Sequence, residues 1–251
     1  MSGRQAMADG RHSMNVYQVK LNGHDQVAEG TMAFRFSKPG GFVFQAGQAI
    51  ALELIDPPAE EGQGSRTLSL VSAPFEPELM VATRMRDSAF KRALKTLPVG
   101  ASMRINGPFG DLTLGDAGRP AVFIAGGIGI TPFMSMLRQA TADRSPQRLF
   151  LAYSNRRPED SAFLDELQEL ERRNKRFHLM ATMTDMSKSA RAWSGETGFV
   201  DADMLKRFIG DLAAPIYYVV GPPAMVEAMQ RTLVGAGIAG DMIRTEEFYG
   251  Y

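Results

Sequence analysis

Cysteine is absent from the 251 residues of the chain. Its absence excludes disulfide bonds, thiolate nucleophiles, cysteine-ligated zinc and any iron–sulfur cluster held by four thiolates of this chain. Histidine is also scarce, with three residues at positions 12, 24 and 178 whose spacing resembles no metal site. The sequence therefore predicts no metal centre.

An excess of charge and a long hydrophobic run are also missing. Lysine and arginine together number 28, and so do aspartate and glutamate, which argues against a large nucleic-acid surface or a polybasic membrane anchor. No apolar run approaches the ~20 residues of a membrane span, and residues 1–13 lack the apolar segment of a secretory signal. We therefore expect a cytoplasmic protein with a flexible tail over 1–13, no membrane span and no nucleic-acid partner.

The pattern of apolar and polar residues changes near residues 115–120, where we place a domain boundary. Before it, apolar and polar residues alternate over short stretches that end in glycine or proline turns, as in Met32, Phe34 and Phe36. This period of two favours an antiparallel barrel or sandwich. A helix is expected there over 88–96.

After the boundary, five solid apolar runs alternate with amphipathic stretches. The runs cover residues 121–125, 148–153, 177–183, 216–220 and 242–248. The stretches between them have apolar residues at helical spacing. This alternation predicts a parallel sheet with right-handed crossovers and helices on both faces.

The first motif is a G-x-G-x-x-P segment made by Gly127, Gly129 and Pro132, with Thr131 before the proline. It follows the first buried run and opens the first helix of the second half. Glycines let a backbone approach a pyrophosphate, and a helix N-terminus offers free N–H groups and a positive dipole end. The alternative is a tight glycine turn without a ligand.

A second motif, Gly221-Pro222-Pro223, follows the fourth apolar run. It places small, rigid backbone at the carboxyl edge of the sheet, where α/β sheets bind ligands. The alternative is an ordinary helix start, since proline suits the first helical positions.

A third motif, Arg66-Thr67-Leu68-Ser69, lies in the first half. On a strand, Arg66 and Ser69 are expected to point to opposite faces. One of them could bind a phosphate while the other contacts a different group of the ligand. The alternative is an ordinary exposed arginine.

Together and in this order, the three motifs resemble the ferredoxin–NADP reductase family of flavoenzymes, over about residues 14–248. The resemblance implies a six-stranded antiparallel Greek-key barrel that binds FAD over 14–117. It also implies a five-stranded parallel α/β domain that binds NAD(P) over 118–251 and ends in a tail beside the flavin.

The barrel motif of the family is R-x-Y-S, which is Arg66-Thr67-Leu68-Ser69 in this chain. By resemblance, Arg66 holds the flavin phosphates and Ser69 lies near the flavin N5. Leu68 replaces the tyrosine, so the usual ring contact with the flavin is lost or supplied elsewhere. Ser88 matches the family's serine at the start of the barrel helix, where backbone amides face a pyrophosphate.

In the second domain, the resemblance assigns the nicotinamide nucleotide to Gly127, Gly129, Thr131 and Pro132 and to Gly221, Pro222 and Pro223. The family has a cysteine directly before the second of these segments, beside the nicotinamide. Val220 stands there instead, so some detail of hydride positioning is expected to differ.

Near the C-terminus, Glu246 and Phe248 match a carboxylate and an aromatic residue that share one face beside the flavin. The resemblance gives both residues, with Ser69, a catalytic role, and Glu246 would tune the flavin or relay protons. The aromatic ring of Tyr251 is expected to cover the flavin, with a frayed chain end as the alternative.

The choice of nucleotide depends on Thr184 and Asp185, which follow the third run where NADP-specific members of the family have Ser-Arg. An aspartate accepts hydrogen bonds from a ribose diol and repels a phosphate dianion. Arg156 and Arg157 argue in the other direction, because either could reach a 2′-phosphate. The aspartate is the more specific signal, so the sequence predicts NADH.

These matches predict a flavin-dependent NAD(P)H oxidoreductase that passes hydride from the nicotinamide to bound FAD. The electrons would continue to a separate acceptor: a ferredoxin, a flavodoxin, an oxygenase component, a free flavin, a ferric chelate or a quinone. FMN in place of FAD is one alternative. The other is a non-catalytic flavin- and nucleotide-binding subunit of a larger redox complex, which the missing tyrosine and cysteine would fit.

Overall fold

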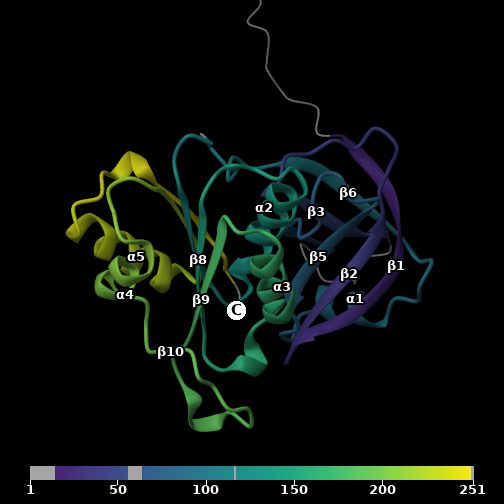
Figure 1. Ribbon diagram of the computed structural model, residues 1–251. Coiled ribbons are helices and arrows are strands. Elements are labelled where there is room, and N and C mark those ends of the chain that lie inside the picture. Colours follow the sequence, from purple (N-terminus) through teal and green to yellow (C-terminus); the bar gives the residue numbers. More distant parts are fainter. Residues whose placement is uncertain (1–14, 56–63, 116, 250–251) are drawn as a thin grey trace, which may run out of the picture.

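The computed structural model describes residues 15–55, 64–115 and 117–249. A barrel of antiparallel strands lies beside a parallel sheet flanked by helices (Figure 1). This arrangement confirms the two-part fold predicted from the sequence. Within the described ranges, no helix is long and apolar enough to cross a membrane.

Six antiparallel strands form the barrel, in the spatial order β4-β3-β6-β1-β2-β5. They are β1 (Val16–Ala28), β2 (Thr31–Ser37), β3 (Ala49–Leu54), β4 (Ser65–Ser69), β5 (Glu78–Arg84) and β6 (Ser102–Phe109). A bridge between Leu70 and Val81 joins the two ends of this sheet and closes the barrel.

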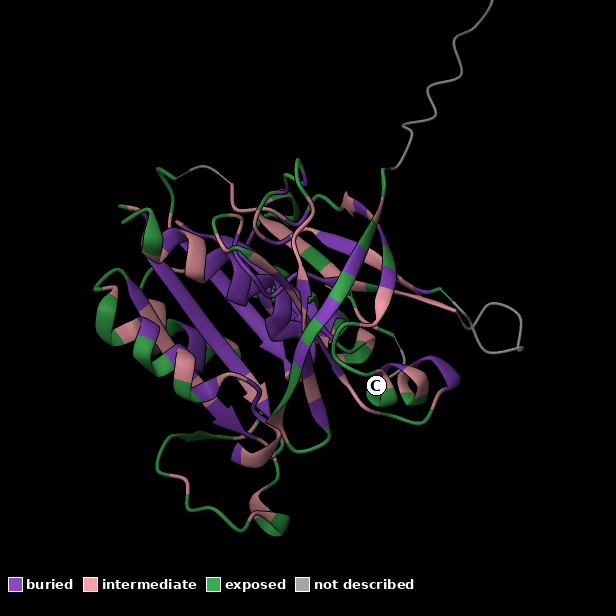
Figure 2. Cartoon of the chain, turned by 90° about the vertical axis from the view of Figure 1, so that its right-hand side faces the viewer, coloured by how far each residue is buried: buried purple, intermediate pink, exposed green. Residues whose placement is uncertain are grey.

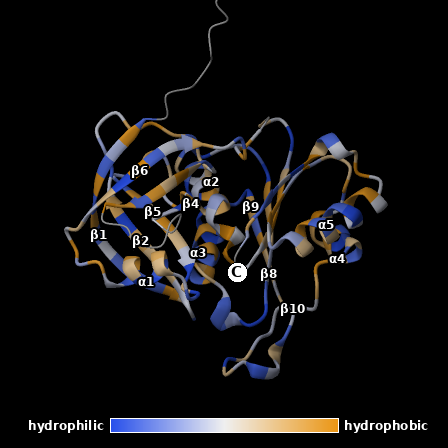
Figure 3. Cartoon of the chain, turned by 180° about the vertical axis from the view of Figure 1, so that it is seen from behind, coloured by the Kyte–Doolittle hydropathy of each residue, from blue (hydrophilic) through white to orange (hydrophobic). Residues whose placement is uncertain are grey.

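The local sequence explains why these segments form a barrel. Buried and more exposed residues alternate through the first half of β1, and apolar and polar residues alternate with them (Figure 3). The inward side chains, such as Phe34, Ile50 and Phe90, are fully buried, and each is worth about 1.5–3 kcal/mol of hydrophobic free energy. The predicted helix is α1 (Ala89–Thr96), which begins after Ser88 because the Ser88 Oγ accepts a hydrogen bond from the Lys91 amide.

The second sheet is parallel throughout, in the order β10-β9-β8-β7-β11-β12. Its strands are β7 (Ala121–Gly126), β8 (Leu149–Asn155), β9 (Phe177–Met183), β10 (Glu196–Thr197), β11 (Ile216–Gly221) and β12 (Ile243–Glu247). The central strands β7 and β11 are buried along their whole length (Figure 2), because helices cover both faces of the sheet.

Four α-helices form these two covers. Helices α2 (Thr131–Ala142) and α3 (Leu164–Arg173) pack on one face, and α4 (Ala202–Ile209) and α5 (Pro223–Gly235) pack on the other. Short 3₁₀ turns complete the domain: η1 (Gly127–Ile130), η2 (Pro158–Asp160), η3 (Met186–Lys188) and η4 (Gly240–Met242). All five predicted strands are present. The sequence did not predict β10, because a polar, exposed segment of two residues has no periodicity to detect.

One apolar core crosses the boundary between the barrel and the parallel sheet. Ala33, Val71 and Ala82 of the barrel belong to the same buried cluster as Phe133 and Leu137 of α2. Helix α2 therefore packs on both the parallel sheet and the barrel, and it connects the two domains.

Candidate active site

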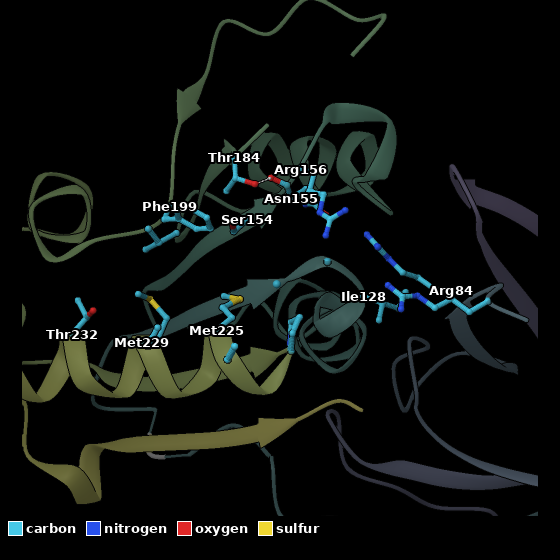
Figure 4. Close-up of a pocket in the computed structure, with 17 residues that line it drawn as sticks. Arg84, Ile128, Ser154, Asn155, Arg156, Thr184, Phe199, Met225, Met229 and Thr232 are labelled. Carbon is cyan, nitrogen blue, oxygen red and sulfur yellow. Dashed lines mark hydrogen bonds between the residues drawn. The ribbon is translucent and has the colours of Figure 1, made fainter. Parts of the chain in front are cut away.

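Two adjoining cavities lie where the barrel meets the carboxyl ends of the parallel strands. The first, of about 590 Å³, is bounded by the ends of β7, β8 and β9 and by α5 (Figure 4). The second, of about 460 Å³, is bounded by β4, β5, α1 and the residues at the end of β12. Ile128 and Arg86 line both cavities, so the two spaces meet at these side chains.

The wall of the first cavity includes the glycine-rich loop after β7. Gly127 has a φ of +55°, in the left-handed region that favours glycine. A Cβ on Gly129 would collide with the Val220 carbonyl oxygen, so only glycine lets the loop pack against β11. A Cβ on Gly221 would lie 3.2 Å from the Gly126 backbone. The two glycine motifs found in the sequence are therefore in contact at the edge of the sheet.

The residues predicted to bind the nucleotide fall into two groups. Gly127, Pro222 and Thr184 line the first cavity, whereas Thr131 lines the second and donates its hydroxyl to the Ile128 carbonyl at 3.0 Å. The others form the loops and turns around the first cavity without lining either one: Gly129, Pro132, Gly221, Pro223 and Asp185.

Methionine side chains, which no sequence motif indicated, form part of the first cavity. Met225 and Met229 line it from α5, and a Cβ on Gly126 would collide with the Met225 sulfur. Val220, at the position of the family's cysteine, is fully buried and lines neither cavity. The sequence held no signal for Met225, because scattered methionines usually fill a core.

Three arginines give the first cavity a positive wall. Arg84 and Arg86 come from the end of β5, and Arg156 follows β8. The side chains of Arg84 and Arg156 reach toward the same space (Figure 4). Among the described residues, none of the three forms an ion pair. Positive charge of this kind suits a phosphate. The signal missed in the sequence was two arginines, two residues apart, at the end of a barrel strand.

The two other charged residues considered for nucleotide choice lie outside the cavity lining. Arg157 is 3.0 Å from Asp160 and 3.2 Å from Glu29 of the barrel, so it joins the two domains. The Asp185 carboxylate accepts hydrogen bonds from the Ser187 hydroxyl and amide, which hold the pKa of that carboxyl below its usual range. Asp185 is therefore ionised, next to Thr184 at the rim of the first cavity.

The second cavity brings together residues of the barrel and residues near the C-terminus. Arg66, Thr67, Leu68 and Ser69 of the barrel motif all line it. Glu246 and Phe248 line it as well, together with Glu247 between them. The amide of Phe248 also donates to the Gly221 carbonyl at 3.0 Å, which ties the end of β12 to the turn at the first cavity.

The prediction that Arg66 and Ser69 point to opposite faces stays a prediction, because all four consecutive residues of the motif line the second cavity. The barrel closes at this point, where Leu70 bridges to Val81 of β5.

Cations surround one end of the second cavity. Arg66, Arg86 and Lys91 all line it, and Arg66 lies over the Phe90 ring at 5.6 Å. Burial lowers the pKa of Lys91, and the positive charges of Arg66 and Arg86 lower it further. Ser88 and the N-terminus of α1 complete this end. A cluster of like charges without a carboxylate partner among the described residues is typical of a site for a phosphate-rich ligand.

The other end of the second cavity offers a hydroxyl and a carboxyl. Ser69 is only 4% exposed. Burial raises the pKa of Glu246, which favours a protonated carboxyl. Tyr249 is 77% exposed and also lines the cavity, whereas the predicted flavin contact Tyr251 lies outside the described residues.

Comparison with known proteins identifies relatives over nearly the whole chain. Residues 123–231 match the family model described as "Oxidoreductase NAD-binding domain". The chain is 31% identical over 227 residues to ferredoxin–NADP reductase B of Sorangium cellulosum, covering 86% of this chain and 90% of that protein. It is 28% identical to the glycine betaine monooxygenase reductase subunit of Chromohalobacter salexigens, covering 97% of this chain and 66% of the relative.

Solved structures share the fold at lower identity. The FAD/NAD-binding domain of the nitric oxide dioxygenase from Vibrio cholerae superposes with a TM-score of 0.81 at 19% identity, covering 92% of this chain and 98% of that one. A ferredoxin NADP+ reductase from Neisseria gonorrhoeae, solved with bound FAD and NADP, superposes with a TM-score of 0.77 at 24% identity, covering 92% and 98%. At these identities the likeness establishes the fold and not the chemistry.

Proposed function

Because the chain belongs to the ferredoxin–NADP reductase family, we propose that it is a flavin-dependent NAD(P)H oxidoreductase. In this proposal residues 14–117 bind FAD and residues 118–251 bind the nicotinamide nucleotide. The main support is the meeting of the two cavities at Ile128 and Arg86. A nucleotide in the first cavity and a flavin in the second would have their reactive ends at one place, as hydride transfer requires.

The charge of the second cavity fits FAD. Arg66, Arg86 and Lys91 would hold its diphosphate, together with Ser88 and the free amides at the start of α1. FAD held there would supply the redox chemistry between the dihydronicotinamide, which it would oxidise by accepting a hydride, and an electron acceptor. FMN, with one phosphate, would use less of this positive surface.

Ser69 and Glu246 are the polar side chains that we assign to the chemistry. The nearly buried Ser69 hydroxyl can donate a hydrogen bond into the second cavity. Burial raises the pKa of Glu246, so its carboxyl keeps a proton to higher pH than an exposed glutamate does. It can supply that proton within the second cavity. Phe248 provides an apolar surface beside them.

The first cavity fits the nucleotide diphosphate. Gly127 and Ile128 of η1 line it from the parallel domain, and Arg84 presents its guanidinium from the barrel. We further propose that NADH is preferred over NADPH. The ionised Asp185, whose pKa is lowered, lies beside Thr184 and would repel a 2′-phosphate dianion.

The electron acceptor is proposed to lie outside these 251 residues, because they contain no cysteine for a four-thiolate cluster. Several relatives are named as reductase components of monooxygenases, and the chain spans 66% of one and 57% of another. A ferredoxin, a flavodoxin or an oxygenase component is therefore the class of acceptor that we propose.

Anaerobic mixing of the purified protein with NADH or NADPH tests the proposal. A yellow protein with FAD released on denaturation, bleached within seconds by one of the nucleotides, is the expected result. A yellow protein that neither nucleotide bleaches would be a flavin-binding subunit without turnover, and would refute the proposed activity.

A further inference from the structure

Arg138, on α2, links the parallel domain to the barrel. Its guanidinium holds Glu166 of α3 by two hydrogen bonds, from Nε to Oε1 at 2.7 Å and from Nη2 to Oε2 at 2.8 Å. The remaining Nη1 reaches the barrel, where it donates to the Val71 carbonyl at 3.3 Å and lies 3.4 Å from both Glu76 carboxylate oxygens. The Arg138 side chain is only 12% exposed, so water competes little for these contacts.

A second contact lies one helical turn before Arg138. The buried Ser135 donates its hydroxyl to the Ser72 carbonyl at 2.6 Å. Residues three apart lie on one side of a helix, so Ser135 and Arg138 bind consecutive carbonyls of the barrel, those of Ser72 and Val71. The barrel holds the same segment from its other side, since the Val71 amide donates to the Met80 carbonyl at 2.7 Å.

The barrel segment and the helix that meet in this contact each lead to a proposed binding site. Ser69, which lines the second cavity, is two residues before Val71 in the chain. Thr131, at the end of the glycine loop, begins the helix about two turns before Arg138. A packed helix is stiff over this length, so the contact between Arg138 and Val71 sets the spacing between the glycine loop and β4.

We propose that Arg138 is a positioning residue for the reaction: it fixes the distance between the nucleotide loop and the flavin-binding strand without touching either ligand. This inference rests on the proposed function. A displacement of ~1 Å between reacting groups can slow a reaction by about 100-fold. Most residues that line the first cavity belong to the parallel domain, and most that line the second belong to the barrel, so ligand affinity is expected to change less than the reaction rate. An ordinary buried ion pair would affect stability alone.

The test compares Arg138→Met with a matched control, both prepared with flavin bound. Arg138→Met removes the charge and keeps an unbranched side chain of similar reach. Arg172→Met removes an arginine that is exposed on α3 and paired with Glu169. Hydrogen exchange of the amides of residues 70–73 reports on the contact itself. Stopped-flow bleaching at saturating NADH, with and without deuterium at the transferred position, reports on positioning.

For Arg138→Met we expect faster hydrogen exchange over residues 70–73 and a fall in bleaching rate of about tenfold or more. We also expect an altered deuterium isotope effect, with flavin content and the dissociation constant of the nucleotide within about twofold of the wild type. Arg172→Met should match the wild type in every measurement. If Arg138→Met fails to fold, Arg138→Lys is measured in its place. Lysine keeps the positive charge but lacks the planar guanidinium that binds Glu166 by two hydrogen bonds. A fall of about threefold or more is expected for that variant.

A folded Arg138 variant with the wild-type bleaching rate and isotope effect would overturn the inference, even with a lower melting temperature. A wild-type protein that neither nucleotide bleaches would overturn the proposed function and this inference with it. The two failures are therefore distinguishable.

Discussion

The Arg84 guanidinium, at the end of β5, lies 3.4 Å from the position that a Cβ on Gly127 would occupy. A cation of the barrel therefore stands over the glycine loop of the other domain. If a nucleotide diphosphate binds at that loop, the barrel contributes to nucleotide binding as well as to flavin binding.

The variant Arg84→Gln tests this contribution. Losing a charge-assisted hydrogen bond to a phosphate costs about 1.5–3 kcal/mol. We therefore expect KM for the nucleotide to rise at least about tenfold, with little change in flavin content. Steady-state kinetics measures the effect, and Arg104→Gln, an exposed barrel arginine paired with Glu53, is the control. An unchanged KM in Arg84→Gln would place the diphosphate elsewhere.

Arg66→Ala is expected to weaken flavin retention. The guanidinium lines the second cavity and stands over the Phe90 ring, so its removal takes away one phosphate contact, worth about ten- to a hundredfold in the dissociation constant. Flavin content after dialysis and fluorescence titration of the stripped protein measure it. The control is Arg92→Ala, an exposed arginine of α1 that pairs with Asp87. Full flavin retention in Arg66→Ala would contradict the assigned phosphate site.

Ser69→Ala is expected to slow bleaching at saturating nucleotide by about tenfold, with flavin content near that of the wild type. The reason is that a hydroxyl on the wall of the second cavity is lost while the phosphate end stays intact. Stopped-flow spectroscopy measures the rate. If the rate is unchanged, Ser69 has no part in the reaction.

Glu246→Gln should raise the melting temperature of the flavin-free protein at pH 7 and leave it unchanged near pH 4. Burial raises the pKa of Glu246, so the folded chain binds this proton more tightly than the unfolded chain. The resulting stability is fully present below the unfolded pKa of about 4.3 and is lost as the pH rises through the folded pKa. Glutamine never ionises, so it escapes this loss. Melting curves across this pH range measure the effect, and the exposed Glu247→Gln is the control. A shift of equal size at both pH values would contradict the assigned cause.

Asp185→Asn should move nucleotide preference toward NADPH. The hydrogen bonds from Ser187 keep this carboxyl ionised, and removing one negative charge near a phosphate dianion is worth about three- to tenfold. The measurement is the ratio of kcat/KM for NADH and NADPH in both proteins. A wild type that prefers NADPH more than tenfold would refute the prediction and would favour Arg156 as the phosphate ligand, because Arg156 lines the first cavity.

Periodicity predicted an antiparallel half and a parallel α/β half, and the family resemblance added the six-stranded barrel. The buried strands of the second half are continuous apolar runs, and the barrel strands alternate, so both sheets could be predicted from local pattern. The exception is β10 (Glu196–Thr197), whose two exposed residues are held by pairing with β9 and not by a preference of their own. The local sequence pattern does not show which strand a segment will pair with.

The candidate site was predicted less completely, because part of it exists only after the domains meet. Arg84 ends a barrel strand and Arg86 follows it, and nothing in their neighbourhood along the chain shows that they line a cavity with a loop of the other domain. Met225 is similar, since its contact with Gly126 joins the start of α5 to the end of β7.

The apolar cluster shared by the barrel and α2 has a consequence for modular exchange. Since Ala33, Val71 and Ala82 are buried against the same cluster as Phe133 and Leu137, a parallel domain produced alone would expose an apolar face that is normally covered. Such a fragment is prone to aggregate. Grafting the nucleotide-binding half of a relative onto this barrel therefore requires transplanting the α2 face along with the nucleotide loop.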